Sequence, residues 1–584
     1  MIRQEIPSAP SGDPPVLIVG AGPAGIVQAL ELRRYGIEVT MLAGGADGFD
    51  PEYQALADAE IVDPTRHAPM RIAVRRAFGG TSLLWGGRCV PFDAIDFADR
   101  PHVPLGGWPI SHDEIWPWYD TAMRYLNAGE AQFSAPLPGV TAMAECRLDR
   151  LERWSEQRNL RWLHADALED DPGLNIILGA TATGLDVDPV TGAVEGVNVC
   201  LASGERTTLR ARAIVLACGG LETARLMLAS RLDRPRLFGG EEGMLGRAYM
   251  AHFEGRIADV VFDPSLPADA FDFFIDKSDR YARRRITINA EAQQRGGLLN
   301  MCAWPDNPLL SDPAHQSAIL SLAYLSLAAP GLGPLLQPEA IRRKYLEHGV
   351  RDAGKHLGNI LFGLPQAARE AVSYLCRRYG TEPRLPGFFI RNKARRYALF
   401  YHAEQAPNLA STVSLGGARD RLGMPRLRVD LRYSDIDVRS VVAGHDVIDR
   451  NLRAAGIGRL EHHFPEAERA AQVREQMTDG YHQIGTTRMA ADAKRGVVDA
   501  DCRVYGTPNL FVAGSAVFPT SGQANPTLLI TALSARLAAH LARLVRELPP
   551  PLSPAQTRER AADAATVRPS FTSRRHPAPE TMAE

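Results

Sequence analysis

A short glycine-rich segment near the N-terminus has the residue types and the spacing of a phosphate-binding turn. The segment 20–25, GAGPAG, directly follows the apolar run 16–19 and precedes a stretch with helical apolar spacing. In such a turn Gly20 permits the tight bend, Gly22 lets backbone N–H groups approach a pyrophosphate, and Gly25 allows the helix to pack closely on the strand. The pattern predicts a dinucleotide site and leaves open whether the dinucleotide is FAD or NAD.

The acidic side chain that normally binds the ribose is missing from its usual place. It is expected about 20 positions after the glycines, at the end of the second strand. Here that strand ends at Ala43, and two glycines follow it. Asp47 and Asp50 are the next carboxylates along the chain, and the sequence leaves open whether either of them reaches the ribose.

Four apolar runs far apart along the chain predict the sheet that positions this turn. The runs 16–19 and 38–42, with the helical stretch between them, form a βαβ unit. Runs of the same character occur at 213–217 and 509–513, and a long helical stretch follows at 526–544. Continuous apolar runs are typical of strands buried on both faces, so we expect these four to build one parallel sheet from remote segments.

Six further segments of the chain contain motifs that bear on its function. In 78–87, FGGTSLLWGG, glycine pairs bracket small and apolar residues, and 107–111 leads into an aromatic helical stretch. The C-terminal segments are EQAPN at 404–408, YHQIGTTRM at 481–489, NLFVAGS at 509–515 and PTSGQANPT at 519–527. Together with the glycine turn, these segments resemble the glucose–methanol–choline (GMC) oxidoreductases, flavoproteins that oxidise alcohols. The resemblance covers 15–260 and 400–545, with the motifs in the same order.

The resemblance implies FAD in place of NAD, and it implies two catalytic residues. His482 falls at the family's histidine position, where the side chain takes the hydroxyl proton of the substrate. Histidine suits this role because its ordinary pKa lies near neutrality. Asn525 falls at the partner position, and a positioned amide can donate a hydrogen bond to the alkoxide as charge develops.

The resemblance also implies how FAD is held. The residues expected around it are Gly20, Gly22, Ala24, Gly25, Gly79, Gly80, Ser82, Trp85, Gly86, Ala182, Gly219, Gly514, Ser515, Asn525, Pro526 and Thr527. Asn525 and Pro526 are typical of the first residues of a helix, whose positive end would face the flavin. Some relatives attach FAD to a histidine in the second glycine segment. Leu84 and Trp85 stand there in this chain, so we expect non-covalent FAD.

Composition limits the classes of partner and the compartment. The 66 basic and 68 acidic residues leave no global basic field for binding nucleic acid or an anionic membrane, although local basic patches remain possible. The seven scattered cysteines contain no CxxC pair, which favours a reducing compartment and predicts no metal site. The N-terminus lacks the layout of a secretory signal, and we expect no integral membrane segment. These features predict a cytoplasmic protein.

The predicted fold class is α/β, with two domains that interleave along the chain. A Rossmann-like FAD-binding domain is discontinuous, from 15–260 and 476–545, with segments of the other domain interleaved. The region 261–475 forms an α+β substrate domain with a mainly antiparallel sheet. It includes a basic helical insertion at 338–380 that covers the substrate region or, alternatively, docks on a membrane surface or a partner. The tail 546–584 is predicted to be disordered.

The predicted activity is oxidation of an alcohol to a carbonyl, by proton abstraction and hydride transfer to flavin N5. The form of the C-terminal motif is more similar to bacterial sugar, polyol and pyranose-type members, which indicates a secondary hydroxyl of a sugar, cyclitol or glycosylated small molecule. A specialised-metabolite alcohol, a flavin monooxygenase and a non-catalytic flavin-binding protein are the alternatives. The sequence leaves open whether the electron acceptor is oxygen, a quinone or another carrier.

Overall fold

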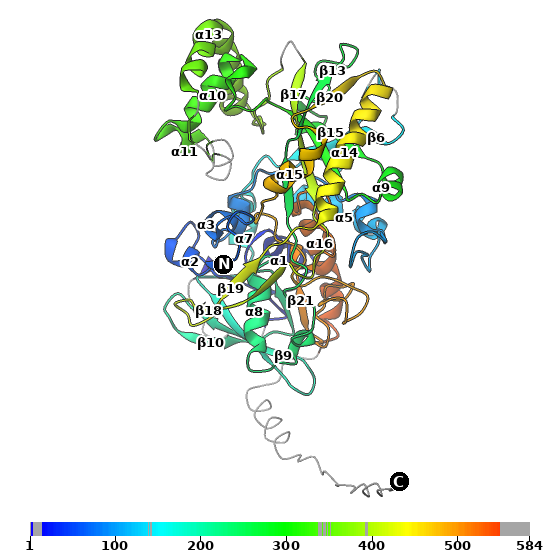
Figure 1. Ribbon diagram of the computed structural model, residues 1–584. Coiled ribbons are helices and arrows are strands. Elements are labelled where there is room, and N and C mark those ends of the chain that lie inside the picture. The colour runs from blue at the N-terminus through cyan, green and yellow to red at the C-terminus, as the bar shows by residue number, and fades with distance from the viewer. Residues whose placement is uncertain are drawn as a thin grey trace, which may run out of the picture.

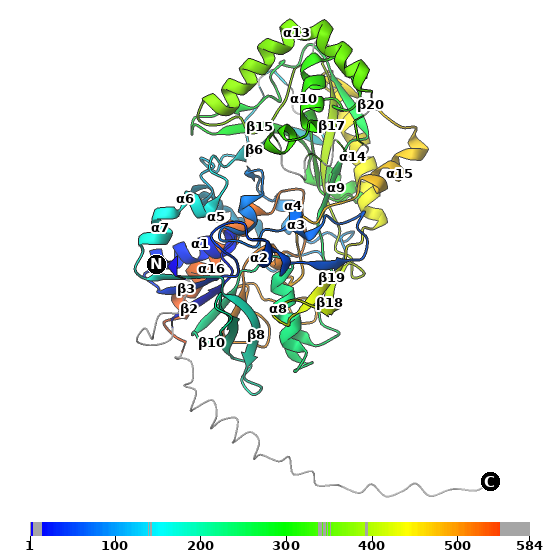
Figure 2. The same cartoon turned by 90° about the vertical axis from the view of Figure 1, so that its left-hand side faces the viewer.

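The computed structural model describes residues 2–3, 14–137, 139–140, 143–336, 342, 346, 349–350, 352–391 and 395–548. A parallel sheet lies toward one end of this part of the chain, and helices α10 and α13 lie at the other end (Figures 1 and 2). The predicted tail lies outside the described residues from 549 onward, as does part of the predicted helical insertion.

The parallel sheet has six strands in the order β1-β7-β3-β2-β11-β21, and all neighbours are parallel. The strands are β1 (Ile2–Arg3), β2 (Val16–Val19), β3 (Val39–Ala43), β7 (Leu174–Leu178), β11 (Ala213–Leu216) and β21 (Leu510–Val512). Every residue of β2 and β11 is buried, which explains their continuous apolar runs. The prediction of one parallel sheet from remote segments is confirmed.

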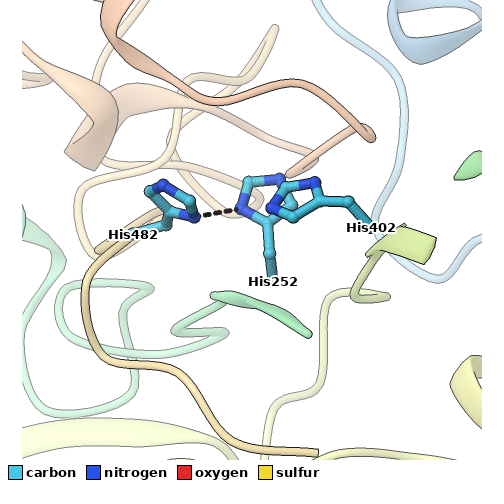
Figure 3. A group of neighbouring side chains, drawn as sticks. All are labelled: His252, His402 and His482. Carbon is cyan, nitrogen blue, oxygen red and sulfur yellow. Dashed lines mark hydrogen bonds between the residues drawn. The ribbon is translucent and has the colours of Figure 1, made fainter. Parts of the chain in front are cut away.

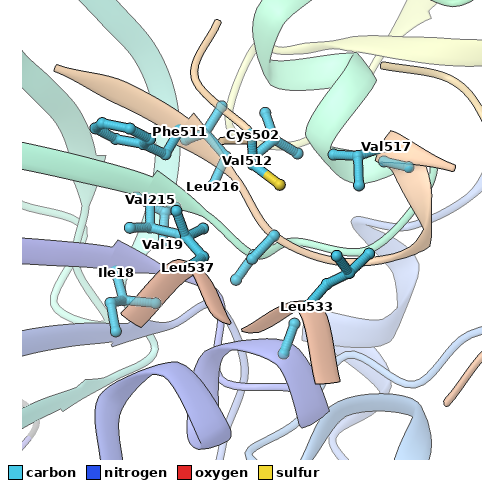
Figure 4. Close-up of a cluster of buried hydrophobic side chains, with 14 of the residues drawn as sticks. Ile18, Val19, Val215, Leu216, Cys502, Phe511, Val512, Val517, Leu533 and Leu537 are labelled. Carbon is cyan, nitrogen blue, oxygen red and sulfur yellow. The ribbon is translucent and has the colours of Figure 1, made fainter. Parts of the chain in front are cut away.

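Helices α1 and α16 cover one part of this sheet, and α5 packs on α16. Helix α16 (Thr527–Leu544) packs against α1 (Pro23–Arg34) and α5 (His112–Tyr125), and Leu533 and Leu537 of α16 reach the sheet (Figure 4). The helix begins one residue later than predicted, since Pro526 already has helical φ and ψ but is its N-cap. In the described part of the chain, α16 is the one helix that is long and apolar enough to cross a membrane, but 61% of that window is buried inside the fold, as in an ordinary core helix.

A second, nine-stranded sheet is antiparallel throughout. Its main path is β20-β13-β17-β16-β15-β6-β5, with β12 added to β17 and β14 to β15. The strands are β5 (Arg88–Cys89), β6 (Cys146–Trp154), β12 (His252–Gly255), β13 (Ala258–Phe262), β14 (Phe274–Ile275), β15 (Tyr281–Ile288), β16 (Met301–Asp306), β17 (Arg396–Glu404) and β20 (Gly458–His462). This sheet confirms the predicted antiparallel class. It draws strands from both sides of residue 260, and the domain limits stay a prediction.

Smaller elements complete the fold. Two three-stranded sheets are formed by β8 (Thr181–Val187), β9 (Val194–Cys200) and β10 (Arg206–Leu209), and by β4 (Ala59–Ile61), β18 (Thr412–Arg419) and β19 (Pro425–Asp430). The remaining α-helices outside the insertion are α2 (Pro51–Ala55), α3 (Met70–Ala73), α4 (Ala94–Phe97), α6 (Leu160–Leu163), α7 (Ala165–Asp170), α8 (Glu222–Arg231), α9 (Ala290–Gly296), α14 (Asp435–Ala454) and α15 (Glu466–Gln476).

The described part of the insertion between β16 and β17 is mainly helical, with irregular segments at 307–312 and 381–391. It contains α10 (Ala318–Ala328), α11 (Leu332–Leu336) and α13 (Ala353–Leu375), which continues into a single turn at Cys376–Gly380. Helix α13 packs against α10 and runs along the outer tip of the molecule (Figures 1 and 2).

Candidate active site

One cavity of about 2440 Å³ extends from the glycine turn after β2 to the helical insertion. Ordinary ligand pockets measure roughly 300–1,000 Å³, so this one has room for a dinucleotide together with a substrate. The predicted cofactor residues that line it are Gly20, Gly22, Ala24, Gly80, Ser82, Trp85, Gly86, Ala182, Gly219, Gly514, Ser515, Asn525, Pro526 and Thr527. Gly25 and Gly79 are not among the described residues that line the cavity. A Cβ atom on Gly25 would stand 1.9 Å from the carbonyl oxygen of Gly20, and the N–H of Gly79 donates to Ala21.

The glycine turn fits a pyrophosphate. Gly20 has a φ of +114°, and a Cβ atom there would stand 2.4 Å from the carbonyl oxygen of Ala217, so only glycine fits. Gly22 is the N-cap of α1, and no side chain caps that helix. The first N–H groups of α1 are therefore available to an anion, and the helix dipole favours negative charge at the same place.

A carboxylate from another part of the chain is linked to the end of β3, where the ribose is expected. Asp50 caps α2, Asp47 pairs with Arg161 at 2.9 Å, and neither is among the described residues that line the cavity. Glu222, at the start of α8, does line it. Arg76 joins this carboxylate to the strand end, since its Nη1 donates to Glu222 Oε2 at 2.7 Å and its Nε to the carbonyl of Gly44 at 2.9 Å.

The structure brings the two predicted catalytic residues together at the cavity wall. The Nδ2 of Asn525 lies 3.2 Å from the Nε2 of His482, and both residues line the cavity. Backbone hydrogen bonds fix the loop that carries His482: the N–H of Ile484 donates to Met250, and that of Gly485 donates to Ser515. Asn525 lies just before the N-cap of α16, and no side chain caps this helix. The amide of Asn525 contacts His482 instead.

Two further histidines, His252 and His402, lie beside His482, and no motif in the sequence indicated them. His252, the first residue of β12, has its Nδ1 3.0 Å from the Nδ1 of His482, and the ring of His402 stacks on that of His252 with centroids 4.5 Å apart (Figure 3). Their positions are 230 and 80 residues away along the chain. No local spacing connects them, and only the pairing of β12 with β17 brings them to one place.

The hydrogen bonds of His252 set the tautomer of His482. The Nε2 of His252 faces the carbonyl oxygens of Ser521 and Gly522 at 3.1 and 3.0 Å, so this nitrogen carries the proton. The Nδ1 of a neutral His252 is then an acceptor, and the Nδ1 of His482 must donate to it. This leaves the Nε2 of His482 as an acceptor, and the Nδ2 of Asn525 donates to it at 3.2 Å. His482 is thereby oriented as a proton acceptor at Nε2.

The charges around the pair support this assignment. Burial and, to a smaller extent, the neighbouring His482 lower the pKa of His252 to about 3, so His252 stays neutral at physiological pH. Burial also holds the pKa of His402 well below its ordinary value. By distance alone the three rings could hold a metal ion, but the Nδ1 atoms of His252 and His482 already share a hydrogen bond.

Asp479 supplies a negative charge beside His482. Its Oδ2 lies 3.4 Å from the Nδ1 of His482 and accepts a hydrogen bond from the backbone N–H of His252 at 2.8 Å. Burial raises the pKa of Asp479, but His482 and the hydrogen bonds outweigh this effect and hold the pKa below its ordinary value. An ionised carboxylate at this place stabilises the ring of His482 when it takes up a proton.

Replacing His252 tests its role as a positioning residue. His252→Phe is expected to lower kcat about 10–100-fold, the usual scale for a group that orients a catalytic side chain, because His482 loses its fixed tautomer. His252→Asn keeps an acceptor near the position of Nδ1 and is expected to restore most of the rate. Steady-state kinetics over a range of pH checks both variants. Equal losses in the two variants would speak for a merely structural role.

Comparison with known proteins gives several matches. Residues 407–534 match the family model for GMC oxidoreductases, and residues 13–47 match a model for an FAD-binding domain. The chain is 32% identical to 6'''-hydroxyparomomycin C oxidase of Streptomyces lividus, over 90% of this chain and 92% of that one. It is 24% identical to paromamine 6'-oxidase of Streptomyces fradiae, over 90% of each chain. Among solved structures, pyridoxine 4-oxidase from Mesorbium loti has a TM-score of 0.52 at 16% identity, with 91% and 99% of the two chains covered, which shows a shared fold.

Proposed function

The chain belongs to the GMC oxidoreductases, a family of FAD-dependent alcohol oxidoreductases, and from this premise we propose that it oxidises a hydroxyl group of a sugar-like molecule to a carbonyl group. The observation that carries the proposal is the pair of His482 and Asn525 at the wall of a cavity that also contains the glycine turn. The named activities of the relatives support a sugar-bearing substrate such as an aminoglycoside or a glycoside. We retain a secondary hydroxyl as the first candidate.

The proposed chemistry assigns a part to each side chain. When bound, FAD would supply the ring that accepts the hydride. The Nε2 of His482 takes the proton of the substrate hydroxyl, and Asn525 donates a hydrogen bond to the oxygen as negative charge develops. His252 holds the Nδ1 proton of His482 in place, and Asp479 stabilises the protonated ring.

An anaerobic reduction assay tests the proposed function. The purified yellow protein is mixed without oxygen with a panel of aminoglycosides, other glycosides, cyclitols and simple alcohols, and flavin bleaching is recorded. We expect bleaching by sugar-bearing alcohols, and product analysis then assigns the oxidised hydroxyl as primary or secondary. Readmitting air distinguishes oxygen from a quinone or another carrier as acceptor. Bleaching by NADPH and by none of the alcohols would favour a monooxygenase instead.

We also propose a cytoplasmic location and no nucleic acid partner. The scattered, unpaired cysteines support the cytoplasmic location. The near balance of basic and acidic residues supports the absence of a nucleic acid partner. Cell fractionation with an antibody against the native chain tests the location.

FAD is expected to be held without a covalent bond. Leu84 and Trp85 occupy the place at which some relatives attach FAD, and both line the cavity. After denaturation and filtration, the yellow colour should pass through the filter, and the mass of the protein should equal that of the bare chain. Colour that stays with the protein would contradict this prediction.

Glu222 is expected to bind the ribose in place of the missing residue at the end of β3. Glu222→Gln removes a charge-assisted hydrogen bond, commonly worth about 1.5–3 kcal/mol, so the Kd of FAD should rise about 10–100-fold. Fluorescence titration of the deflavinated protein measures this directly. The control is Asp47→Asn, since Asp47 pairs with Arg161 outside the cavity lining. A similar Kd in both variants would remove Glu222 from the site.

A further inference from the structure

A broad apolar surface is exposed on the helical insertion. Along α13 the exposed apolar side chains follow one another at spacings of 4, 3, 4, 4 and 3 residues, which places them on one side of the helix. They are Leu357, Leu361, Leu364, Ala368, Val372 and Leu375. Phe362 of the same helix is 95% exposed, and Leu335 of α11 is 82% exposed. Contiguous apolar surfaces of this kind mark sites of interaction, whereas single exposed residues do not.

This surface is separate from the side of α13 that the fold already uses. His356 and Ala367 are buried, and the Nδ1 of His356 lies 2.9 Å from the hydroxyl of Ser321 on α10. Helix α13 therefore packs on α10 with one side and leaves an adjacent apolar side uncovered at the outer tip of the molecule (Figure 2).

Charge identifies the kind of partner. The sequence from 309 to 391 contains ten basic and six acidic residues, an excess of four positive charges in a chain whose net charge is −2. Arg369 and Arg377 are exposed in this segment, and the exposed Arg384 pairs with Glu382. A second copy of the chain would bring like charge against like charge, whereas an anionic bilayer attracts basic residues beside an inserted apolar face.

The breadth of the apolar surface also favours a lipid bilayer over a second copy of the chain. A contact between two helices uses a narrow stripe of apolar side chains on each. Here the apolar surface is wider, because Phe362 lies outside the row from Leu357 to Leu375, and Leu335 lies on helix α11. Lipid accommodates such a broad face because it surrounds each inserted side chain. We propose that this surface, formed by α13 and α11, docks the protein peripherally on an anionic lipid bilayer.

The docking surface borders the active-site cavity. Leu375 is half-exposed at the end of the row on α13, and it also lines the cavity, together with Leu332 of α11 and Tyr379. A docked molecule would therefore hold one end of its cavity near the lipid headgroups. Docking on a bilayer does not depend on which alcohol is oxidised, and the experiment below measures vesicle binding instead of turnover.

A native cysteine allows a direct test. Of the seven cysteines, all within the described residues, Cys376 alone is exposed, and it directly follows the last residue of α13. A polarity-sensitive fluorophore on Cys376 of the full-length holoprotein is mixed with vesicles of phosphatidylcholine alone or with 30% phosphatidylserine. We expect a blue shift and co-sedimentation with the anionic vesicles, and a clear decrease of both as salt is raised. Absence of both at low salt would overturn the proposal.

A double variant on this surface and a control variant elsewhere distinguish specific from nonspecific binding to vesicles. Leu361→Asp combined with Phe362→Asp should lower the vesicle partition coefficient at least about tenfold, since two large apolar side chains are lost from the bilayer. Val190→Asp is the control: Val190 is 78% exposed, in the turn between β8 and β9, and the variant should bind vesicles normally. Both proteins should keep their flavin spectrum and melting temperature.

Two results would overturn the assignment. The first is equal loss of vesicle binding in the control variant. The second is a dimer, seen by light scattering, that the paired aspartates dissociate, because the surface would then be covered by a second copy. Charge is tested separately with Arg369→Glu combined with Arg377→Glu, which should weaken binding to anionic vesicles and leave the residual binding to phosphatidylcholine unchanged.

Discussion

His482→Ala is expected to lower turnover about 10²–10⁴-fold, the general scale for loss of a catalytic base, while FAD stays bound. The Nε2 of His482 carries the lone pair that faces the cavity, and Asn525 is the side chain next to it. The loss should therefore fall on kcat, and the flavin absorption spectrum should keep its shape. Stopped-flow reduction under anaerobic conditions isolates this step from reoxidation.

The control for this variant is His463→Ala. His463 pairs with Asp259 at 2.8 Å and is not among the described residues that line the cavity. We expect its turnover to remain close to that of the unmodified enzyme. Normal turnover in His482→Ala would remove His482 from the mechanism.

A double-mutant cycle links His482 to His252. If His252 acts by orienting His482, His252→Phe should cost little when His482 is already alanine. The two effects are then far from additive. Additive losses would mean that His252 contributes to the reaction by a route of its own.

The sequence predicted the parts of the site that depend on local order. Burial on both faces gives β2 and β11 continuous apolar runs, and the tight turn at Gly20 requires glycine, so both leave a visible pattern. His482 and Asn525 lie in motifs of their own. His252 and His402 leave no such pattern, because the pairing of β12 with β17 determines their positions.

Two acidic residues were missed for different reasons. Asp479 precedes His482 by three positions, and an acid that close to a histidine in a motif was a signal that could have been used. Glu222 was hidden, since it reaches the end of β3 only through Arg76, which lies 146 residues away along the chain. The missing acid at Ala43 was visible in the sequence, but the proposal that Glu222 replaces it required the three-dimensional arrangement.

The second large effect concerns a buried ion pair between the segment after α4 and strand β17. Arg100 and Glu404 have fully buried side chains, and their two hydrogen bonds measure 2.7 and 2.5 Å. Glu404 also accepts the backbone N–H of Asn300 at 2.8 Å. Burial raises the pKa of nearby Asp96, and the charge of Glu404 raises it further, so this region already holds closely spaced acids.

Arg100→Met is therefore expected to destabilise the protein by about 3–5 kcal/mol, because it leaves the charge of Glu404 buried without the positive charge that pairs with it. Adding Glu404→Leu should recover most of this loss, since a well-packed apolar pair avoids the cost of burying an isolated charge. Urea denaturation of the holoprotein, followed by tryptophan fluorescence, compares the single and double variants. The control is Arg428→Met, which breaks an exposed pair with Glu60 and should cost no more than about 1 kcal/mol. If Arg100→Met costs as little as that control, or if the double variant is no more stable than the single one, the stability of this region does not depend on pairing the buried charge of Glu404.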